Sequence, residues 1–145
     1  MKGAINSTER RTITVDYQLS ASLQDVWRVL TEPDLLKSWL MPNDIRPTVG
    51  HHFTFRTAPA PGFDGVVQCK VLAVEPGSRF VYSWRGGPLD TIVTWTLTPA
   101  AGGGTVLRLE HTGFGPEHGM TYDLLSEGWR QKVAKQLEQT VSSID

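Results

Sequence analysis

The chain has 145 residues, a length that fits one domain able to bury a sizeable core. Its 14 Lys and Arg nearly balance its 15 Asp and Glu, which argues against the basic stripe of a nucleic-acid-binding protein. No apolar run is long enough for a membrane span or a signal peptide, so we expect no membrane insertion. Cys69 is the single cysteine, which excludes an internal disulfide and a cysteine-based zinc cluster and favours a reducing, cytoplasmic location.

The chain begins with a polar segment and a strand. Residues 1–10 predict a flexible N-terminus ahead of a single domain over residues 11–145. Over residues 11–19 apolar side chains alternate with polar ones, which is the period of a half-buried strand.

Two short helices are predicted next. Ser22 and Asp25 have nearly the spacing of a capping box, so a helix is expected over residues 22–31. Pro33 suits the first turn of a second helix, which Pro42 ends.

From Gly50 the period changes to two, and short apolar alternations are separated by glycine- and proline-containing turns. Such spacing is typical of an antiparallel meander. The predicted strands cover residues 50–57, 65–74, 79–84, 90–99 and 105–112.

The last segment, residues 121–144, has a helical period. Its apolar residues recur at steps of four, four, four, four and three, which predicts one apolar stripe on a helix of roughly six turns. The stripe consists of Leu125, Trp129, Val133, Leu137, Val141 and Ile144. A sheet with one apolar face needs a cover, and this helix is the only predicted element long enough to provide it.

Six segments resemble, in order and spacing, the START-like, birch-pollen-allergen-like superfamily (SRPBCC). Within it, the chain is similar to the branch related to the C-terminal domain of the activator of the ninety-kilodalton heat-shock chaperone ATPase. The segments are DVWRVLTEPDLLKSWL (25–40), VG (49–50) followed by FTF, VLAVEPGSRFVYSW (71–84), TIVTWTLTP (91–99), GTVLRLEHTGF (104–114) and EGWRQKVAKQLEQTV (127–141).

The resemblance implies an α+β helix-grip fold. A curved antiparallel sheet of about six or seven strands would wrap around the long C-terminal helix, with two short helices after the first strand and a hydrophobic cavity between sheet and helix. Relatives include lipid carriers, polyketide cyclases, hormone receptors and the chaperone-activating domain, so the fold alone does not select a function.

The histidines do not form a metal-binding pattern. Zinc needs three or four converging ligands, and neither an H-x-H nor an H-x-x-x-H spacing occurs among His51, His52, His111 and His118. We therefore predict no metal site and no cofactor.

His111 has two interpretations. It falls on the inward face near the end of a predicted strand, where it is either a hydrogen-bonded core histidine or a general base beside a cavity. In the segment HTGFGPEHGM, His111 and Thr112 are expected to end the strand, residues 113–119 to form a loop, and His118 to be an ordinary loop residue. Cys69 lies between inward valines and is expected to act as a small hydrophobe.

The inward aromatic side chains are the remaining candidates for a site. They either fill the core or wall a ligand pocket whose polar groups are the Tyr82 hydroxyl, indole N–H groups and His111. The candidate ligand-binding residues are Phe55, Tyr82, Trp84, Trp95, His111, Trp129 and Val133.

Three functions are proposed as hypotheses. The favoured one is a non-enzymatic module that binds a small hydrophobic or aromatic molecule between the sheet and the C-terminal helix. The second is a cyclase- or hydrolase-like enzyme with His111 as general base and Tyr82 as donor. The third is a chaperone partner or stress-response interaction protein. Edge strands of the sheet leave homodimerisation open.

Overall fold

The structure, a computed structural model, describes residues 11–144; the predicted flexible segment 1–10 lies outside them. Six strands and a set of helices succeed one another along the chain. In order they are β1 (Arg11–Leu19), α2 (Leu23–Thr31), α3 (Pro33–Trp39), β2 (His52–Arg56), β3 (Val66–Glu75), β4 (Arg79–Gly86), β5 (Leu89–Pro99), η1 (Ala101–Gly103), β6 (Thr105–Phe114), η2 (Pro116–His118), α4 (Gly119–Glu127), η3 (Gly128–Lys132) and α5 (Val133–Ser143).

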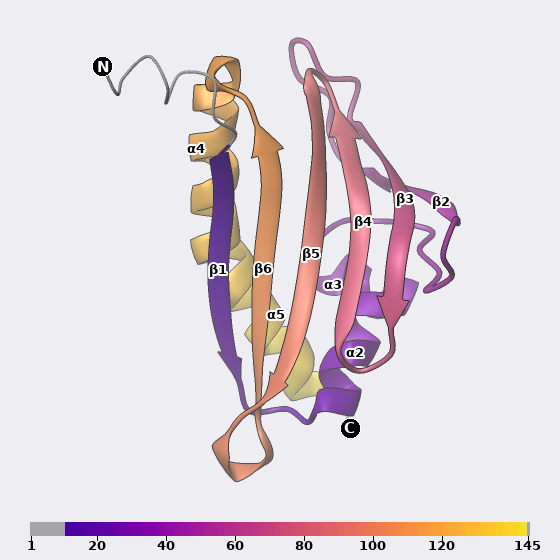
Figure 1. The fold of residues 1–145 in the computed structure, drawn as a ribbon, viewed down its shortest axis with the longest axis vertical. Coiled ribbons are helices and arrows are strands. Elements are labelled where there is room, and N and C mark those ends of the chain that lie inside the picture. Colours follow the sequence, from indigo (N-terminus) through magenta and orange to yellow (C-terminus); the bar gives the residue numbers. More distant parts are fainter. Residues whose placement is uncertain (1–10, 145) are drawn as a thin grey trace.

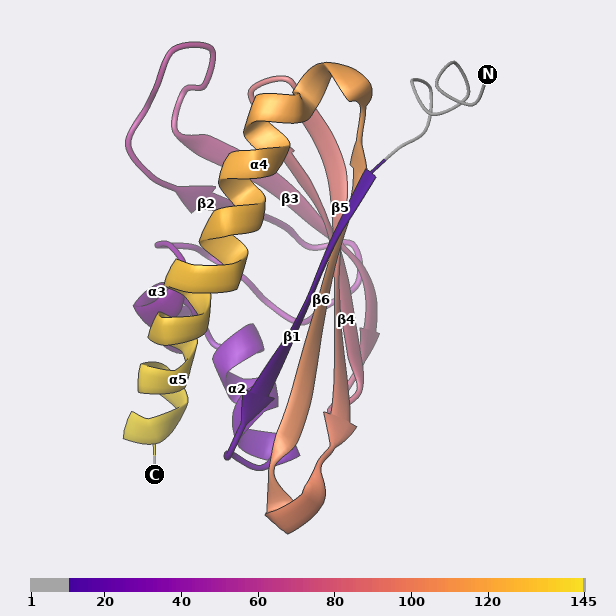
Figure 2. The ribbon, with the colours of Figure 1, turned by 90° about the vertical axis from the view of Figure 1, so that its left-hand side faces the viewer.

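The strands form one antiparallel sheet in the order β1-β6-β5-β4-β3-β2. Figure 1 views the sheet from its outer face, with the helices behind it. Figure 2, turned by 90°, shows α4 and α5 running along the inner face as one long helical segment. The predicted α+β helix-grip fold is confirmed, with six strands. No helix among residues 11–144 is both long and apolar enough to cross a membrane.

The end of β6 differs from the prediction because of a β-bulge. Arg11 pairs with Phe114 and Thr12 with Thr112, so Gly113 is an extra residue in β6. Its φ of 105° is a conformation that glycine adopts without strain. The bulge turns Phe114 to the inner face, where it is fully buried. The strand therefore ends at Phe114, two residues beyond the predicted Thr112.

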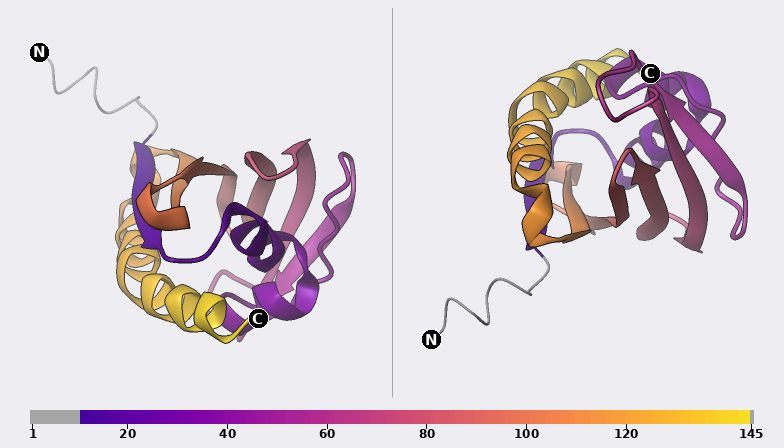
Figure 3. Two further views of the ribbon diagram at one scale, coloured as in Figure 1. Left: turned by 90° about the horizontal axis from the view of Figure 1, so that it is seen from below. Right: turned by 90° about the horizontal axis from the view of Figure 1, so that it is seen from above.

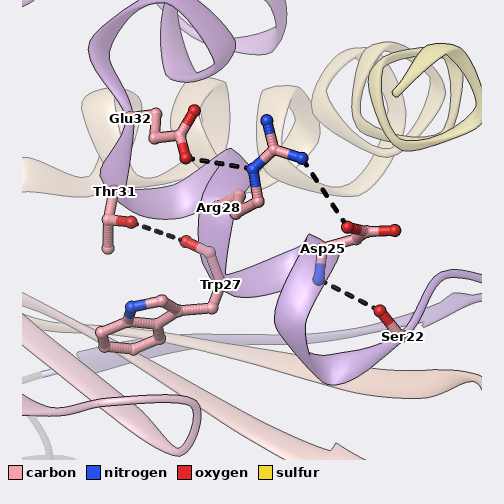
Figure 4. Close-up of polar contacts among 6 residues, drawn as sticks. All are labelled: Ser22, Asp25, Trp27, Arg28, Thr31 and Glu32. Atoms are coloured by element: carbon pink, nitrogen blue, oxygen red, sulfur yellow. Dashed lines mark hydrogen bonds and ion pairs between the residues drawn. The ribbon is translucent and has the colours of Figure 1, made fainter. Parts of the chain in front are cut away.

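Helix α2 begins as its sequence predicts. Ser22 accepts a hydrogen bond from the backbone N–H of Asp25 at 3.2 Å. On the exposed side, the Arg28 guanidinium lies 3.0 Å from Glu32 and 3.8 Å from Asp25 (Figure 4). The opposite side carries Trp27, whose ring contacts Phe80 of β4 at 5.7 Å. The amphipathic helix thus fixes one end of the covering layer against the sheet.

The C-terminal helical segment begins at Gly119, two residues before the predicted start, and contains a π-helical turn. Within η3 the backbone N–H of Val133 bonds to the carbonyl of Gly128, five residues earlier. The predicted stripe points inward: Trp129, Val133, Leu137 and Val141 are buried, and Leu125 and Ile144 are partly buried against the core.

The two short helices close one end of the molecule. Figure 3 shows α2, α3 and the C-terminal helix together on one side of the sheet. Trp39 of α3 is buried, and its indole N–H donates to the Val29 carbonyl of α2 at 2.8 Å. This end of the interior is therefore tightly joined, whereas α4, at the other end, contains no buried residue.

Candidate functional site

The interior between sheet and helix is a continuous network of aromatic rings. The ring centroid of Trp129, on the helix, lies 5.8 Å from that of Trp84 on β4 and 5.7 Å from that of Trp95 on β5. Trp95 in turn contacts Trp39 of α3 at 5.7 Å and Tyr17 of β1 at 6.4 Å. All four pairs are edge-to-face or tilted, the geometry that aromatic quadrupoles favour.

Tyr82 lies among the phenylalanine rings of the same network. Its ring contacts Phe53 at 5.2 Å, Phe80 at 5.5 Å and Phe55 at 6.1 Å. The hydroxyl accepts a hydrogen bond from the Trp95 indole N–H at 3.1 Å, and this is its only hydrogen-bond partner among residues 11–144. Burial raises the pKa of Tyr82 well above its ordinary value, so the hydroxyl keeps its proton.

His111 both accepts and donates a hydrogen bond, in the middle of a chain that runs from the Trp129 indole to the backbone carbonyl of Trp84. The Trp129 indole N–H donates to His111 Nδ1 at 3.2 Å. The proton is therefore on Nε2, which donates to Thr91 Oγ1 at 2.8 Å. Thr91 Oγ1 donates in turn to the backbone carbonyl of Trp84 at 2.9 Å. Each polar atom in this chain is satisfied within the core.

This arrangement makes His111 a structural histidine. Its side chain is fully buried, and desolvation by burial lowers its pKa to about 3, so the ring is neutral near pH 7. Nδ1 already accepts from Trp129, and Nε2 has no lone pair to offer. A general base needs a free nitrogen within reach of a substrate proton. The geometry therefore favours the core interpretation of His111 over the catalytic one.

Tyr17 ties the helix to the first strand at the π turn. Its hydroxyl donates to the backbone carbonyl of Trp129 at 2.6 Å. A π turn changes the intrahelical pairing, and an inserted side-chain donor can bond a carbonyl left available there. Trp129 thus accepts a hydrogen bond from Tyr17 of β1 at its backbone carbonyl and donates one to His111 of β6 from its indole N–H.

The model of the family described as "Activator of Hsp90 ATPase homolog 1-like protein" matches residues 20–142. The chain belongs to this family. The match and the helix-grip fold together place it in the START-like superfamily, as the resemblance of its six segments indicated.

Solved structures agree with membership in the family. Protein MLL2253 from Mesorhizobium loti is 39% identical, with a TM-score of 0.83 over 93% of this chain and 99% of that one. CalU16 from Micromonospora echinospora is 24% identical, with a TM-score of 0.73 over 93% of this chain and 78% of that one. DynU16, from the dynemicin biosynthetic locus, is 23% identical, with a TM-score of 0.77; the match covers 91% of this chain and 47% of DynU16. The last two likenesses show the fold alone. No curated protein is significantly similar to the chain.

The residues singled out from the sequence gather in the interior of the domain. All seven are buried, and six of them are joined by ring contacts or hydrogen bonds, whereas Val133 packs in the same core from the next turn of the helix. The seven are Phe55, Tyr82, Trp84, Trp95, His111, Trp129 and Val133. Cys69 is also buried, and burial raises the pKa of its thiol, as suits a small hydrophobe.

Two polar members of the site were missed in the sequence. Thr91 has the same strand parity as Val93 and Trp95, and this parity indicates an inward side chain. Tyr17 lies in the first predicted strand, but the sequence does not mark it as a hydrogen-bond donor to the helix. Its partner is a backbone carbonyl 112 residues away, and no local pattern marks such a carbonyl.

His118 is not the ordinary loop residue that was predicted. It is buried, and its Nδ1 accepts the backbone N–H of Gly115 at 3.0 Å, while its Nε2 lies 3.5 Å from Glu117. The ring therefore closes the short η2 turn between β6 and α4. Among residues 11–144 no three His, Cys, Asp or Glu side chains gather as metal ligands.

Proposed function

We propose that the protein binds a small hydrophobic or aromatic molecule between the sheet and the C-terminal helix. The observation that carries the proposal is the Tyr82 hydroxyl, which is fully buried and accepts from Trp95 but has no acceptor for its own hydrogen among residues 11–144. A buried donor without an acceptor is costly, and a ligand oxygen would satisfy it. The ligand class is therefore an apolar body that carries one hydrogen-bond acceptor, such as an aryl ketone.

The surroundings of Tyr82 support an aromatic ligand body. Phe53, Phe55 and Phe80 contact the Tyr82 ring, and the Trp95 indole N–H bonds its hydroxyl. Apolar walls with few fixed polar groups are typical of small-molecule sites.

The arrangement of α4 supports a route into this interior. No residue of α4 is buried, and Met120 and Leu124 are 80% and 67% exposed. Tyr122 holds the helix to the sheet: its ring contacts Phe114 at 5.3 Å, and its hydroxyl donates to the Thr12 carbonyl at 3.3 Å. Elements with few buried contacts open at low free-energy cost. A ligand would enter by displacing α4 rather than α2 or α3.

The test compares two ligands of nearly equal size. Acetophenone carries a carbonyl and ethylbenzene does not, and binding of each is followed by the indole ¹H–¹⁵N signals of Trp95 and Trp129. We expect acetophenone to bind about three- to tenfold more tightly, the range of one neutral hydrogen bond. In the Tyr82→Phe variant this preference should disappear. In the control variant Tyr122→Phe, which lacks only a peripheral hydroxyl, it should remain. Absence of saturable shifts at both indoles with either compound would disprove interior binding.

The family description favours a second candidate, in which the domain acts on an Hsp90-type chaperone ATPase. The test is the ATPase rate of such a chaperone with and without the purified protein. An unchanged rate, together with no co-elution of the two proteins, would dispose of this candidate.

A further inference from the structure

The outer face of the sheet, opposite to the helices, carries two adjoining hollows. One, of about 610 Å³, lies beside the β2–β3 loop and the β4–β5 turn, and the other, of about 650 Å³, lies over β2 to β5. Gln68 and Arg85 line both of them, so the two form one groove. In Figure 1 the strands that carry this groove, β2 to β5, form the right-hand half of the sheet, with their outer face toward the viewer. It is separated from the aromatic interior by the sheet itself.

The strand register sets the side chains of the groove in two rows. His52 pairs with Lys70 and Ser83 pairs with Ile92, which gives one row across four strands. The second row is Thr54, Gln68, Arg85 and Asp90, each the pairing partner of the next. Residues diagonally related on neighbouring strands lie within reach of long side chains. Lys70 and Arg85 are so related, with Ser83 beside both.

The β3–β4 ladder is altered where these residues meet. The backbone N–H of Lys70 donates to Ser83 Oγ at 3.0 Å, so a side-chain oxygen takes the place of a ladder carbonyl. This bond uses Ser83 Oγ as an acceptor, and it is the only hydrogen bond of that hydroxyl among residues 11–144. A hydroxyl is also a donor, and its hydrogen is available to an acceptor in the groove.

Two cationic side chains near Ser83, Lys70 and Arg85, have N–H donors that no ion pair among the described residues uses. Lys70 makes no ion pair among the described residues, whereas Arg85 is paired with Asp90 through Nε alone, at 3.1 Å. The other carboxylates of the groove, Asp44 and Asp64, accept the backbone N–H groups of Thr54 at 2.8 Å and of Val66 at 3.0 Å. The Lys70 ammonium, the Arg85 terminal nitrogens and the Ser83 hydroxyl form a donor set suited to a carboxylate.

Apolar side chains border this donor set. Ile92 lies opposite Ser83 in the adjacent strand, and Leu72 is the next outward residue after Lys70 on β3. They are 41% and 42% exposed, unusually high for large aliphatic residues. A β-bulge lies at Leu72: Val71 pairs with Tyr82 and Ala73 with Val81, so Leu72 is an extra residue in β3.

We propose that this outer groove is a second binding site, which takes a small carboxylate with an apolar body. The carboxylate lies between Lys70, Ser83 and Arg85, and the apolar body lies along Leu72 and Ile92. The inference is independent of interior binding, because its residues lie on the opposite face of the sheet.

The test is an NMR titration of the ¹⁵N-labelled protein at low salt with three probes. Hexanoate carries both parts of the proposed ligand, acetate only the charge, and hexanol only the apolar chain. We expect saturable shifts at the amides of Lys70, Ser83 and Ile92 with hexanoate, and binding at least threefold weaker for acetate and for hexanol.

Matched variants locate the charge contact. Lys70→Gln should weaken hexanoate binding about three- to fivefold, the effect of one exposed charged contact. Lys132→Gln removes the same charge from the exposed side of the helix and should leave the affinity unchanged. Tyr82→Phe, which tests the interior site, should also leave it unchanged. Equal affinities for hexanoate and hexanol, no saturable shift at Ser83, or equal weakening by both lysine variants would overturn the proposal.

Discussion

Protonation of His111 should couple the stability of the fold to pH. In the unfolded chain a histidine takes up a proton near its ordinary pKa of 6.5, whereas burial lowers the folded value to about 3. Between these two values the unfolded chain binds more protons, so stability falls as the pH falls. The contribution is fully present above pH 6.5 and is lost towards pH 3. At about 1.4 kcal/mol per pH unit, the loss is about 3 kcal/mol at pH 4.5 and about 5 kcal/mol over the whole window.

The assay is urea unfolding at pH 7 and at pH 4.5, followed by far-UV circular dichroism, for the native protein and for His111→Gln. The amide of glutamine both donates and accepts but does not titrate. The variant should be less stable at pH 7, yet lose about 3 kcal/mol less than the native protein on going to pH 4.5. The contributions of other acid-sensitive groups are the same in both proteins and cancel in the comparison. One such group is Asp16, whose pKa is lowered by its hydrogen bond to Arg108. Equal losses in the two proteins would refute a buried neutral His111.

Two further predictions concern the partners of His111 and Trp129. Thr91→Val keeps the side-chain shape but leaves His111 Nε2–H without an acceptor. The free energy of unfolding, measured by urea titration, should therefore fall by about 1–3 kcal/mol. The control variant Thr96→Val, on the outer face, should change it by less than about 0.5 kcal/mol. Tyr17→Phe removes the bond to the Trp129 carbonyl. It should lower stability by about 1–2 kcal/mol and speed hydrogen exchange of the Trp129 indole N–H; unchanged exchange would show that Tyr17 does not hold the π turn.

The fold was largely predictable because its signals are local. Strand alternation and the helical stripe each depend on side chains a few residues apart, and the burial of both agrees with the structure. The end of β6 was mispredicted for a physical reason: one inserted residue, Gly113, reverses the inward–outward parity of the next residue in the strand. With strict alternation Phe114 would point outward. The bulge instead brings its ring to within 4.7 Å of His111.

The site was only partly predictable because its hydrogen bonds join distant strands. Sequence parity places Thr91 and His111 on the inner face, but their bond depends on the β5–β6 register, which pairs Val93 with His111. The sequence therefore left both interpretations of His111 open. The protonated nitrogen and its acceptor decide between them, and both depend on contacts across three strands and the helix.

The π turn itself is explained by the spacing of the stripe. Successive steps of four residues on an α-helix each advance about 40° beyond a full turn, and the final step of three falls about 60° short. From Leu125 to Ile144 an unbroken α-helix would thus rotate the stripe by about 100°, enough to carry one end away from the sheet. One extra residue in a turn absorbs about 100°. The turn at Gly128–Lys132 supplies that residue, and the stripe residues Trp129, Val133, Leu137 and Val141 are all buried. The geometry that aligns the helix with the sheet is therefore the same one that gives Tyr17 a carbonyl to bind and sets the Trp129 indole on His111.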